Sequence, residues 1–101
     1  MALVAQQKKK FRAIGHKLNP IVTIAGNGLS EGVLSELDRA LEDHELIKVK
    51  LSSNDRAFRE QAIHELTASS KSALVQVIGK VAILLRRSKK PNPKLSNLLR
   101  K

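Results

Sequence analysis

The tetrapeptide Ala-Gly-Asn-Gly at residues 25–28 is the stretch of this sequence best suited to hold a charged group with its backbone. It follows a short apolar run and precedes a segment with helical spacing. Because glycine has no side chain, the backbone there can approach a ligand closely, and the first N–H groups of a following helix point outward with the positive end of its dipole. The pattern therefore predicts either a plain strand-to-helix turn or a surface that holds phosphate.

This glycine loop does not match the two common nucleotide-binding motifs. The GxxxxGK[ST] motif of nucleotide hydrolases is absent. Gly26, Gly28 and Gly32 give GxGxxxG, in which the third glycine comes one residue later than in a dinucleotide fingerprint. Glu31 falls in the first helical turn and would repel a phosphate placed near it, so a nucleic-acid backbone must lie over Gly26–Leu29.

No arrangement of side chains in the sequence predicts catalysis or a bound metal. The three histidines, His16, His44 and His64, are widely spaced and form no HxxxH or HExxH motif. Cysteine is absent, and so is the GxSxG motif of serine hydrolases. We therefore expect no enzyme activity and no cofactor. The lack of cysteine and of a secretory apolar segment also leads us to expect a cytoplasmic protein.

Charge is unevenly distributed along the 101 residues, whose formal net charge is +10. Residues 1–30 carry +5 without an acid, residues 31–65 carry −4, and residues 66–101 carry +9 without an acid. Two basic ends around an acidic middle favour a polyanionic partner over a surface charged only for solubility. No segment is apolar enough to span a bilayer, and no helix pairs a basic face with a strongly apolar one, so we expect no membrane partner.

Hydrophobic spacing predicts the elements that position the loop and the basic residues. Helical spacing is present at residues 4–15, after an N-cap at Ser30, and at about 55–69. Short apolar or alternating runs predict strands at 21–25, 45–51, 73–78 and 81–85. The order α-β-α-β-α-β-β predicts an α/β fold in which helices pack on a mixed four-stranded sheet.

The sequence also predicts a helix end, a hairpin turn and a basic strand face. Gly15 is expected to end the first helix, and Gly79-Lys80 suits a two-residue hairpin turn. Lys48 and Lys50 alternate with apolar residues, which predicts a strand with one buried face and one wet, basic face.

The chain is expected to form one domain followed by a basic tail. Residues 1–87 have the size and the apolar content of a single domain. Residues 88–101 are basic and interrupted by prolines, so they are expected to form a flexible tail with a few apolar residues resting on the body.

The aromatic content decides which kind of nucleic-acid binding is expected. Phe11 and Phe58 are the only aromatic residues, and both fall on predicted core faces. Domains that stack unpaired bases need exposed rings. The remaining mode is contact of lysines, arginines and backbone N–H groups with phosphate and sugar, which predicts salt-dependent binding dominated by the shape of a structured RNA. Charge alone does not exclude DNA.

Two segments of the sequence resemble the CRM domain in its small, stand-alone bacterial form, the YhbY-like proteins. They are LNPIVTIAGNGLSEGVLSELDRALEDHELIKVKL and VQVIGKVAILLRR, and their most specific parts are GNGLSEGV, HELIKVK and VIGK with an arginine after the last strand. The resemblance runs from the first helix to about Arg86. It implies a fold similar to the C-terminal domain of a bacterial translation initiation factor. It also implies RNA binding, with a GxxG loop comparable to that of KH domains, and association with precursors of the large ribosomal subunit.

At two positions the sequence departs from the family pattern. The GxxG window falls on residues 25–28, where Ala25 replaces the first glycine. Alanine tolerates a positive φ poorly, so either position 25 does not need one or Gly26 makes the turn. Leu85 stands where the family usually has an aromatic residue before the arginine matched by Arg86, which removes a possible ring contact with RNA.

Together these observations predict a non-catalytic, monomeric protein that binds structured ribosomal RNA in precursors of the large subunit and aids ribosome assembly. The residues expected to contact RNA are the loop and a set of cations: Gly26, Asn27, Gly28, Leu29, Lys8, Lys9, Lys10, Arg12, Lys17, Lys80, Arg86 and Arg87. Two alternatives stay open. One is a ribosome-associated module that binds a basic protein through its acidic helix, and the other is a general DNA-binding protein.

Overall fold

The structure is a computed structural model that describes residues 5–25 and 29–98. Val4 of the predicted first helix and Gly26, Asn27 and Gly28 of the predicted loop lie outside the described residues. The elements are α1 (Ala5–His16), β1 (Pro20–Ala25), α2 (Glu31–His44), β2 (Leu46–Ser52), α3 (Arg56–Ser70), β3 (Ala73–Ile78) and β4 (Val81–Leu85). The predicted order of helices and strands is confirmed.

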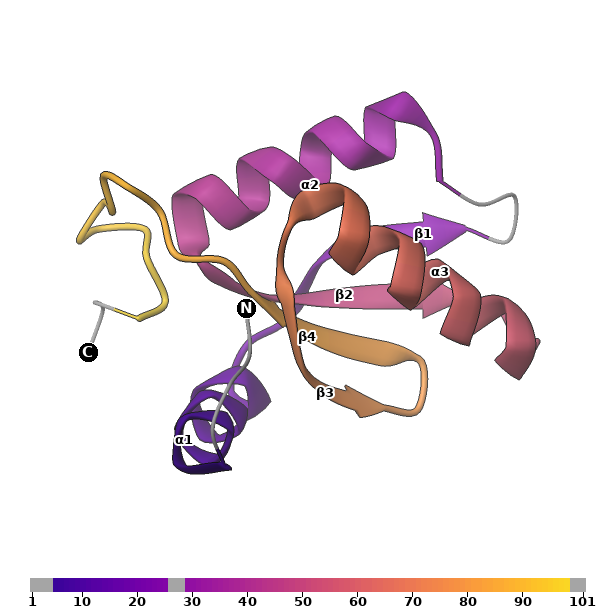
Figure 1. The fold of residues 1–101 in the computed structure, drawn as a ribbon, viewed down its shortest axis with the longest axis horizontal. Helices are drawn as coiled ribbons and strands as arrows, with labels where there is room; N and C mark the ends of the chain where they lie inside the picture. Colours follow the sequence, from indigo (N-terminus) through magenta and orange to yellow (C-terminus); the bar gives the residue numbers. More distant parts are fainter. Residues whose placement is uncertain (1–4, 26–28, 99–101) are drawn as a thin grey trace.

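The four strands form one mixed sheet with the order β1-β2-β4-β3. β1 runs parallel to β2, and β4 is antiparallel to both β2 and β3. Figure 1 shows α2 and α3 on one face of this sheet and α1 on the other. The predicted mixed four-stranded sheet is thereby confirmed, and the molecule has three layers.

A hydrophobic cluster lies on each side of the sheet. The larger cluster joins the sheet to α2 and α3, where Leu37, Leu41 and Leu66 are fully buried. The smaller cluster joins it to α1 and consists of Phe11, Leu46, Val75, Ile83 and Leu85, with Ile14, Leu18 and Leu98 packed against it. The central strand β4 is therefore covered on both faces, which explains why its sequence, VAILL, is wholly apolar.

β2 has one buried face, as predicted, but its other face is wet only in part. Leu46 is fully buried beneath α1, Lys48 is half-buried, and Lys50 is exposed. Nζ of Lys48 donates to the carbonyl of His16 at 3.2 Å, which places a cation at the C-terminal end of α1. The predicted basic face is therefore open at Lys50, whereas α1 covers its other end.

Two helices begin at side chains that accept backbone hydrogen bonds. Ser30 is the N-cap of α2, and its Oγ accepts from the N–H of Val33 at 3.2 Å, as predicted. A carboxylate oxygen of Asp55 accepts from the N–H groups of Ala57 at 3.0 Å and Phe58 at 3.3 Å. Because Asp55 is a cap, α3 itself begins one residue later than predicted.

β3 and β4 are joined by the predicted two-residue turn. Gly79 has a φ of 57°, while Lys80 is not among the residues with positive φ. A positive φ at the first central residue alone is the pattern of a type II′ turn, in which glycine stands first. The carbonyl of Lys80 accepts from the N–H of Leu51 at 2.7 Å, so the turn is also tied to the end of β2.

The C-terminal segment lies against the body of the protein. Ser96 is fully buried, and Leu98 packs against the smaller cluster. Nδ2 of Asn97 donates to the carbonyl of Leu46 at 2.6 Å. The structure thus contains the expected apolar contact and adds polar contacts that the sequence did not predict, while the flexibility of this segment stays a prediction.

Gly15 does not end the first helix, contrary to the prediction. α1 continues to His16, and Gly15 is buried against Ile83. A Cβ added at Gly15 would lie 2.8 Å from Cδ1 and 3.0 Å from Cγ2 of Ile83. The glycine therefore allows α1 to approach the sheet closely, and its position near a helix end is a consequence of where α1 crosses β4.

Replacing Gly15 with valine should lower the free energy of unfolding by about 1–3 kcal/mol, because the new side chain would overpack against Ile83. The matched control is Ala13→Val on the exposed side of the same helix, where only helix propensity changes, at a cost of about 0.5 kcal/mol. Urea denaturation of both variants measures the difference. Equal losses of stability would show that α1 does not depend on close approach at Gly15.

Candidate nucleic-acid interface

The predicted phosphate loop begins at an edge of the sheet where other strands also end. Ala25 closes β1 and is paired with Ser52, the last residue of β2. The hairpin turn lies at the same edge, because Lys50 is paired with Val81 at the start of β4. The β3–β4 turn, which contains Lys80, therefore lies at the end of the sheet where β1 also ends (Figure 1).

Ala25 has the backbone of a strand residue. The described residues other than glycine that have positive φ are Glu45 and Lys71, so position 25 does not use the conformation for which glycine is favoured. Of the two explanations for the alanine, the first is therefore correct: position 25 does not need positive φ. Gly26, Asn27 and Gly28 lie outside the described residues.

The residues after the loop define where a ligand can approach α2. The side chain of Leu29 is half-buried and packs against the larger cluster. Ser30 satisfies one of the free N–H groups of the helix, and the exposed Glu31 follows it. Anion binding before Ser30, which the sequence argument about Glu31 requires, stays a prediction.

Two lysines lie at the edge of the sheet where β1 ends. Lys80 is exposed, and its Nζ donates to Oδ1 of Asn54. Lys50 is exposed on β2, where its neighbours across the sheet are Thr23 and Val81. The sequence analysis placed Lys50 on a basic face but did not include it among the binding residues. The signal was available, since a lysine near the end of a strand that pairs with β1 must lie near the loop.

The other predicted cations lie at the opposite end of the sheet. The exposed cations of α1 are Lys8, Lys9, Lys10 and Arg12, and exposed Lys17 follows the helix. Arg87 is exposed, and its guanidinium carbon lies 5.8 Å from the centroid of the Phe11 ring. The seven residues of β2 span about 20 Å. The described residues therefore form two groups. The loop-end group consists of Leu29, Lys80 and the added Lys50, and the α1-end group consists of Lys8, Lys9, Lys10, Arg12, Lys17 and Arg87.

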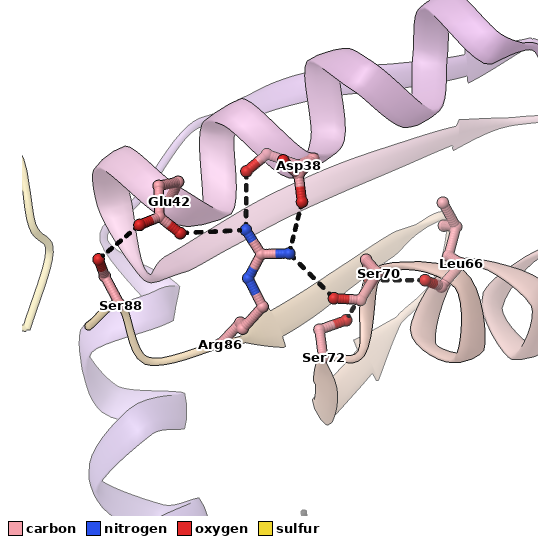
Figure 2. Close-up of polar contacts among 7 residues, drawn as sticks. All are labelled: Asp38, Glu42, Leu66, Ser70, Ser72, Arg86 and Ser88. Carbon is pink, nitrogen blue, oxygen red and sulfur yellow. Dashed lines mark hydrogen bonds and ion pairs between the residues drawn. The ribbon is translucent and has the colours of Figure 1, made fainter. Parts of the chain in front are cut away.

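Arg86 is held by contacts within the protein (Figure 2). One terminal nitrogen donates to Oδ1 of Asp38 at 2.7 Å and to the carbonyl of Ser70 at 3.0 Å. The other donates to the carbonyl of Asp38 at 2.9 Å and to Oε2 of Glu42 at 3.5 Å. Its side chain is 19% exposed. These contacts give Arg86 a structural role, and its contact with RNA stays a prediction.

The chain matches the model of the CRS1/YhbY (CRM) domain over residues 3–86. It belongs to the CRM domain family. A Pseudomonas aeruginosa protein named "Probable RNA-binding protein" is 56% identical over 100 residues, which are 99% of this chain and 96% of that protein. A Haemophilus influenzae protein named "RNA-binding protein" is 44% identical over 86 residues, which are 85% of this chain and 87% of that protein. In both relatives the matched region is most of the protein, as in the stand-alone form of the CRM domain.

A solved structure also resembles this CRM domain. It is the solution structure of a hypothetical protein from Staphylococcus aureus, described there as a candidate RNA-binding protein. The two chains are 34% identical and superpose with a TM-score of 0.77, over 88% of this chain and 93% of the other. The family that the sequence resembles and the predicted α/β fold are both confirmed.

The described part of the CRM domain has a surface groove but no metal site and no membrane-spanning helix. Among its residues, no group of three or more His, Cys, Asp or Glu could hold a metal ion, and no helix is long and apolar enough to cross a membrane. A groove of about 620 Å³ lies between α3 and β3, with Leu74 and Val77 in its wall. Thr67 lies in this groove, and its hydroxyl donates to the carbonyls of Ile63 and His64 in its own helix. The hydroxyl is therefore engaged within α3.

Replacing Arg86 with methionine should lower the free energy of unfolding by about 2–3 kcal/mol. The carbonyls of Asp38 and Ser70 would lose a charged donor that a methionine of similar length cannot replace. Arg39→Met on the exposed side of α2 is the matched control and should change stability by less than about 0.5 kcal/mol. Thermal and urea denaturation provide the comparison, and a stable Arg86→Met variant would rule out the structural role.

Proposed function

We propose that this CRM domain is a non-catalytic RNA-binding protein that recognises RNA through its phosphate and sugar groups. The observation that carries the proposal is the loop-end group: β1 ends at Ala25, just before the glycine-rich sequence, at the same end of the sheet as exposed Lys50 and Lys80. The membership of the family and the names of its relatives support RNA as the polyanion.

The charged residues support this proposal by the way in which they are paired. In the described ranges, the ion pairs are Arg56 with Glu60 and Arg86 with Asp38 and Glu42. None of these pairs involves a lysine, so the lysines of the loop end and of α1 keep their charge available for phosphate. Neutralising phosphates with such side chains releases counterions from RNA, and this makes binding depend strongly on salt.

The positions of the two phenylalanines favour recognition of backbone over recognition of bases. Phe11 is 2% exposed, and Phe58 is half-buried against the larger cluster. Neither ring is free to stack on an unpaired base, the contact on which single-strand binders depend. A protein that contacts phosphate and sugar distinguishes RNA by its shape, and we therefore propose that the partner is a structured RNA.

Binding to a structured ribosomal RNA fragment should weaken on the order of 100-fold between about 50 and 200 mM salt, since about five phosphate contacts would release their counterions. Gly28→Asp should weaken binding a further ~10-fold at constant salt, because its carboxylate would lie where the phosphate binds. Fluorescence anisotropy with a labelled RNA measures both effects.

Two control variants separate the causes of that loss. Gly28→Asn places a neutral side chain of similar size in the loop, and Ser35→Asp adds the same charge on the exposed face of α2. The proposal requires Gly28→Asp to be the most damaging of the three. Affinity that hardly changes with salt, or an equal effect of Ser35→Asp, would contradict it. Equal affinity for duplex DNA would instead favour a general nucleic-acid binder.

We further propose that the RNA is ribosomal RNA in precursors of the large subunit, where this protein aids assembly as a cytoplasmic monomer. The family resemblance supports this finer assignment. Crosslinking in cells, followed by sequencing of the bound RNA, should enrich precursor sequences of the large subunit, and Gly28→Asp should reduce that enrichment. Enrichment of messenger or transfer RNA would contradict the assignment.

The same crosslinking experiment can distinguish RNA binding from docking of the acidic helix α2 on a basic protein. Asp38 and Glu42 are engaged by Arg86, so Glu31 and Glu36 are the exposed acids of α2 that can be changed without breaking that contact. The RNA-binding proposal requires that reversal of both to lysine preserves the association with ribosomal precursors. Loss of the association would show that α2 docks on a basic protein.

A further inference from the structure

We infer that residues 88–98 form a second RNA-contacting surface, which Glu45 holds in place beside α1. The inference rests on the proposed RNA binding and adds a site to it. The segment lies beyond residues 3–86, which match the family model, whereas the alignment with the Pseudomonas aeruginosa relative covers 99% of this chain and so includes it. The surface is therefore an addition to the CRM domain of this chain.

Glu45 is a buried acid that joins both ends of this segment to the body. It is 4% exposed, and it ends α2 with φ 62° and ψ −45°, a conformation that residues other than glycine rarely adopt. Its Oε2 accepts from the backbone N–H of Ser88 at 2.7 Å, and its Oε1 accepts from the hydroxyl of Ser96 at 2.6 Å. The strained backbone thus aims one carboxylate at two points of the chain that lie eight residues apart.

Contacts on either side of Glu45 complete the attachment. The N–H of Asn97 donates to the carbonyl of His44 at 2.9 Å, and Nδ1 of His44 donates to the carbonyl of Leu95 at 2.8 Å. Leu98 packs against the smaller cluster that also holds α1. Residues 88–98 are therefore anchored by a carboxylate, by backbone hydrogen bonds and by an apolar side chain.

The anchored segment displays cations at the same end of the sheet as those of α1. Its lysines, Lys89, Lys90 and Lys94, are all exposed. Arg87, which precedes the segment, lies over the ring of Phe11 in α1, and Leu98 shares a hydrophobic cluster with that same ring. Figure 1 shows the segment and α1 at the end of the sheet opposite the hairpin turn. The α1-end group therefore gains three lysines in fixed positions.

Glu45 is itself negatively charged, but by anchoring the segment it favours the binding of a polyanion. Because the carboxylate is buried and receives two hydrogen bonds, it exposes little negative charge to a ligand. A free tail would have to be ordered when RNA binds, and an anchored one avoids that loss of conformational entropy. RNA phosphates are the ligand that fits three exposed lysines beside a basic helix, with no acid in the chain after Glu65.

Two full-length variants test the inference. The charge variant removes three cations and leaves the anchor intact: Lys89→Gln, Lys90→Gln and Lys94→Gln. It should bind structured RNA at least ~10-fold more weakly and reduce the salt slope by about two to three. The release variant keeps the net charge and removes anchoring groups: Ser96→Ala and Asn97→Ala. It should bind ~3–10-fold more weakly, and backbone amides of residues 88–98 should exchange faster.

The matched control removes three exposed cations from the α2–α3 side: Arg39→Gln, Arg56→Gln and Lys71→Gln. It should bind more tightly than the charge variant by at least ~3-fold. If wild type binds and Gly28→Asp weakens binding, but the charge and release variants bind like wild type, the inference is overturned and the proposed function stands. A charge variant that only equals the control also overturns it. If wild type itself does not bind structured RNA, the proposed function fails first.

Discussion

The guanidinium of Arg86 fixes the relative position of the three elements on which the rest of the fold depends. It follows β4, contacts Asp38 and Glu42 on α2, and donates to the carbonyl of Ser70 at the end of α3 (Figure 2). The last carbonyls of a helix lack partners within it, so a cation there satisfies an acceptor and opposes the negative end of the dipole. Arg86 therefore ties α2 and α3 to the end of β4, at the end of the sheet opposite the hairpin turn.

Features that depend on neighbouring residues could be predicted from the sequence, whereas features that depend on distant ones could not. Ser30 accepts from a residue three positions away, and the turn at Gly79 depends on its own φ, so each was evident from a short stretch of sequence. Glu45 and Ser96 are 51 positions apart, and nothing near either residue indicates the contact. Gly15 looked like a helix end because its true partner, Ile83, belongs to β4.

The candidate site was predictable to the same extent. The turn that contains Lys80 followed from the pattern of strands and turns, and the pairing of β2 with β1 and β4 places Lys50 at the same end of the sheet, while the loop stays a prediction. The division of the cations into two groups could not be predicted without the sheet topology, because distance along the sequence does not show which end of a strand a helix covers. Arg86 and Arg87 are adjacent and were both predicted to contact RNA, although one is held by acids and the other is exposed.

The alternation of charge along the chain has a structural role in addition to the role in binding proposed above. Three acids of the negative middle block, Asp38, Glu42 and Glu45, contact the strongly basic last block through Arg86, Ser88 and Ser96. These acids draw the end of the chain onto α2 and leave its lysines exposed. A uniform mixture of charges would provide neither effect, because each lysine would have an acid near it.

Ala25 shows which part of the glycine motif the fold requires. As the last residue of β1, paired with Ser52, it has a strand backbone that alanine adopts without cost, so a glycine is not needed where the loop begins. At the other side, Ser30 already caps α2, and Glu31 would repel an anion. Any backbone that contacts phosphate is thereby confined to residues 26–29, and the part of the motif that this chain retains, Gly-Asn-Gly, falls within those limits.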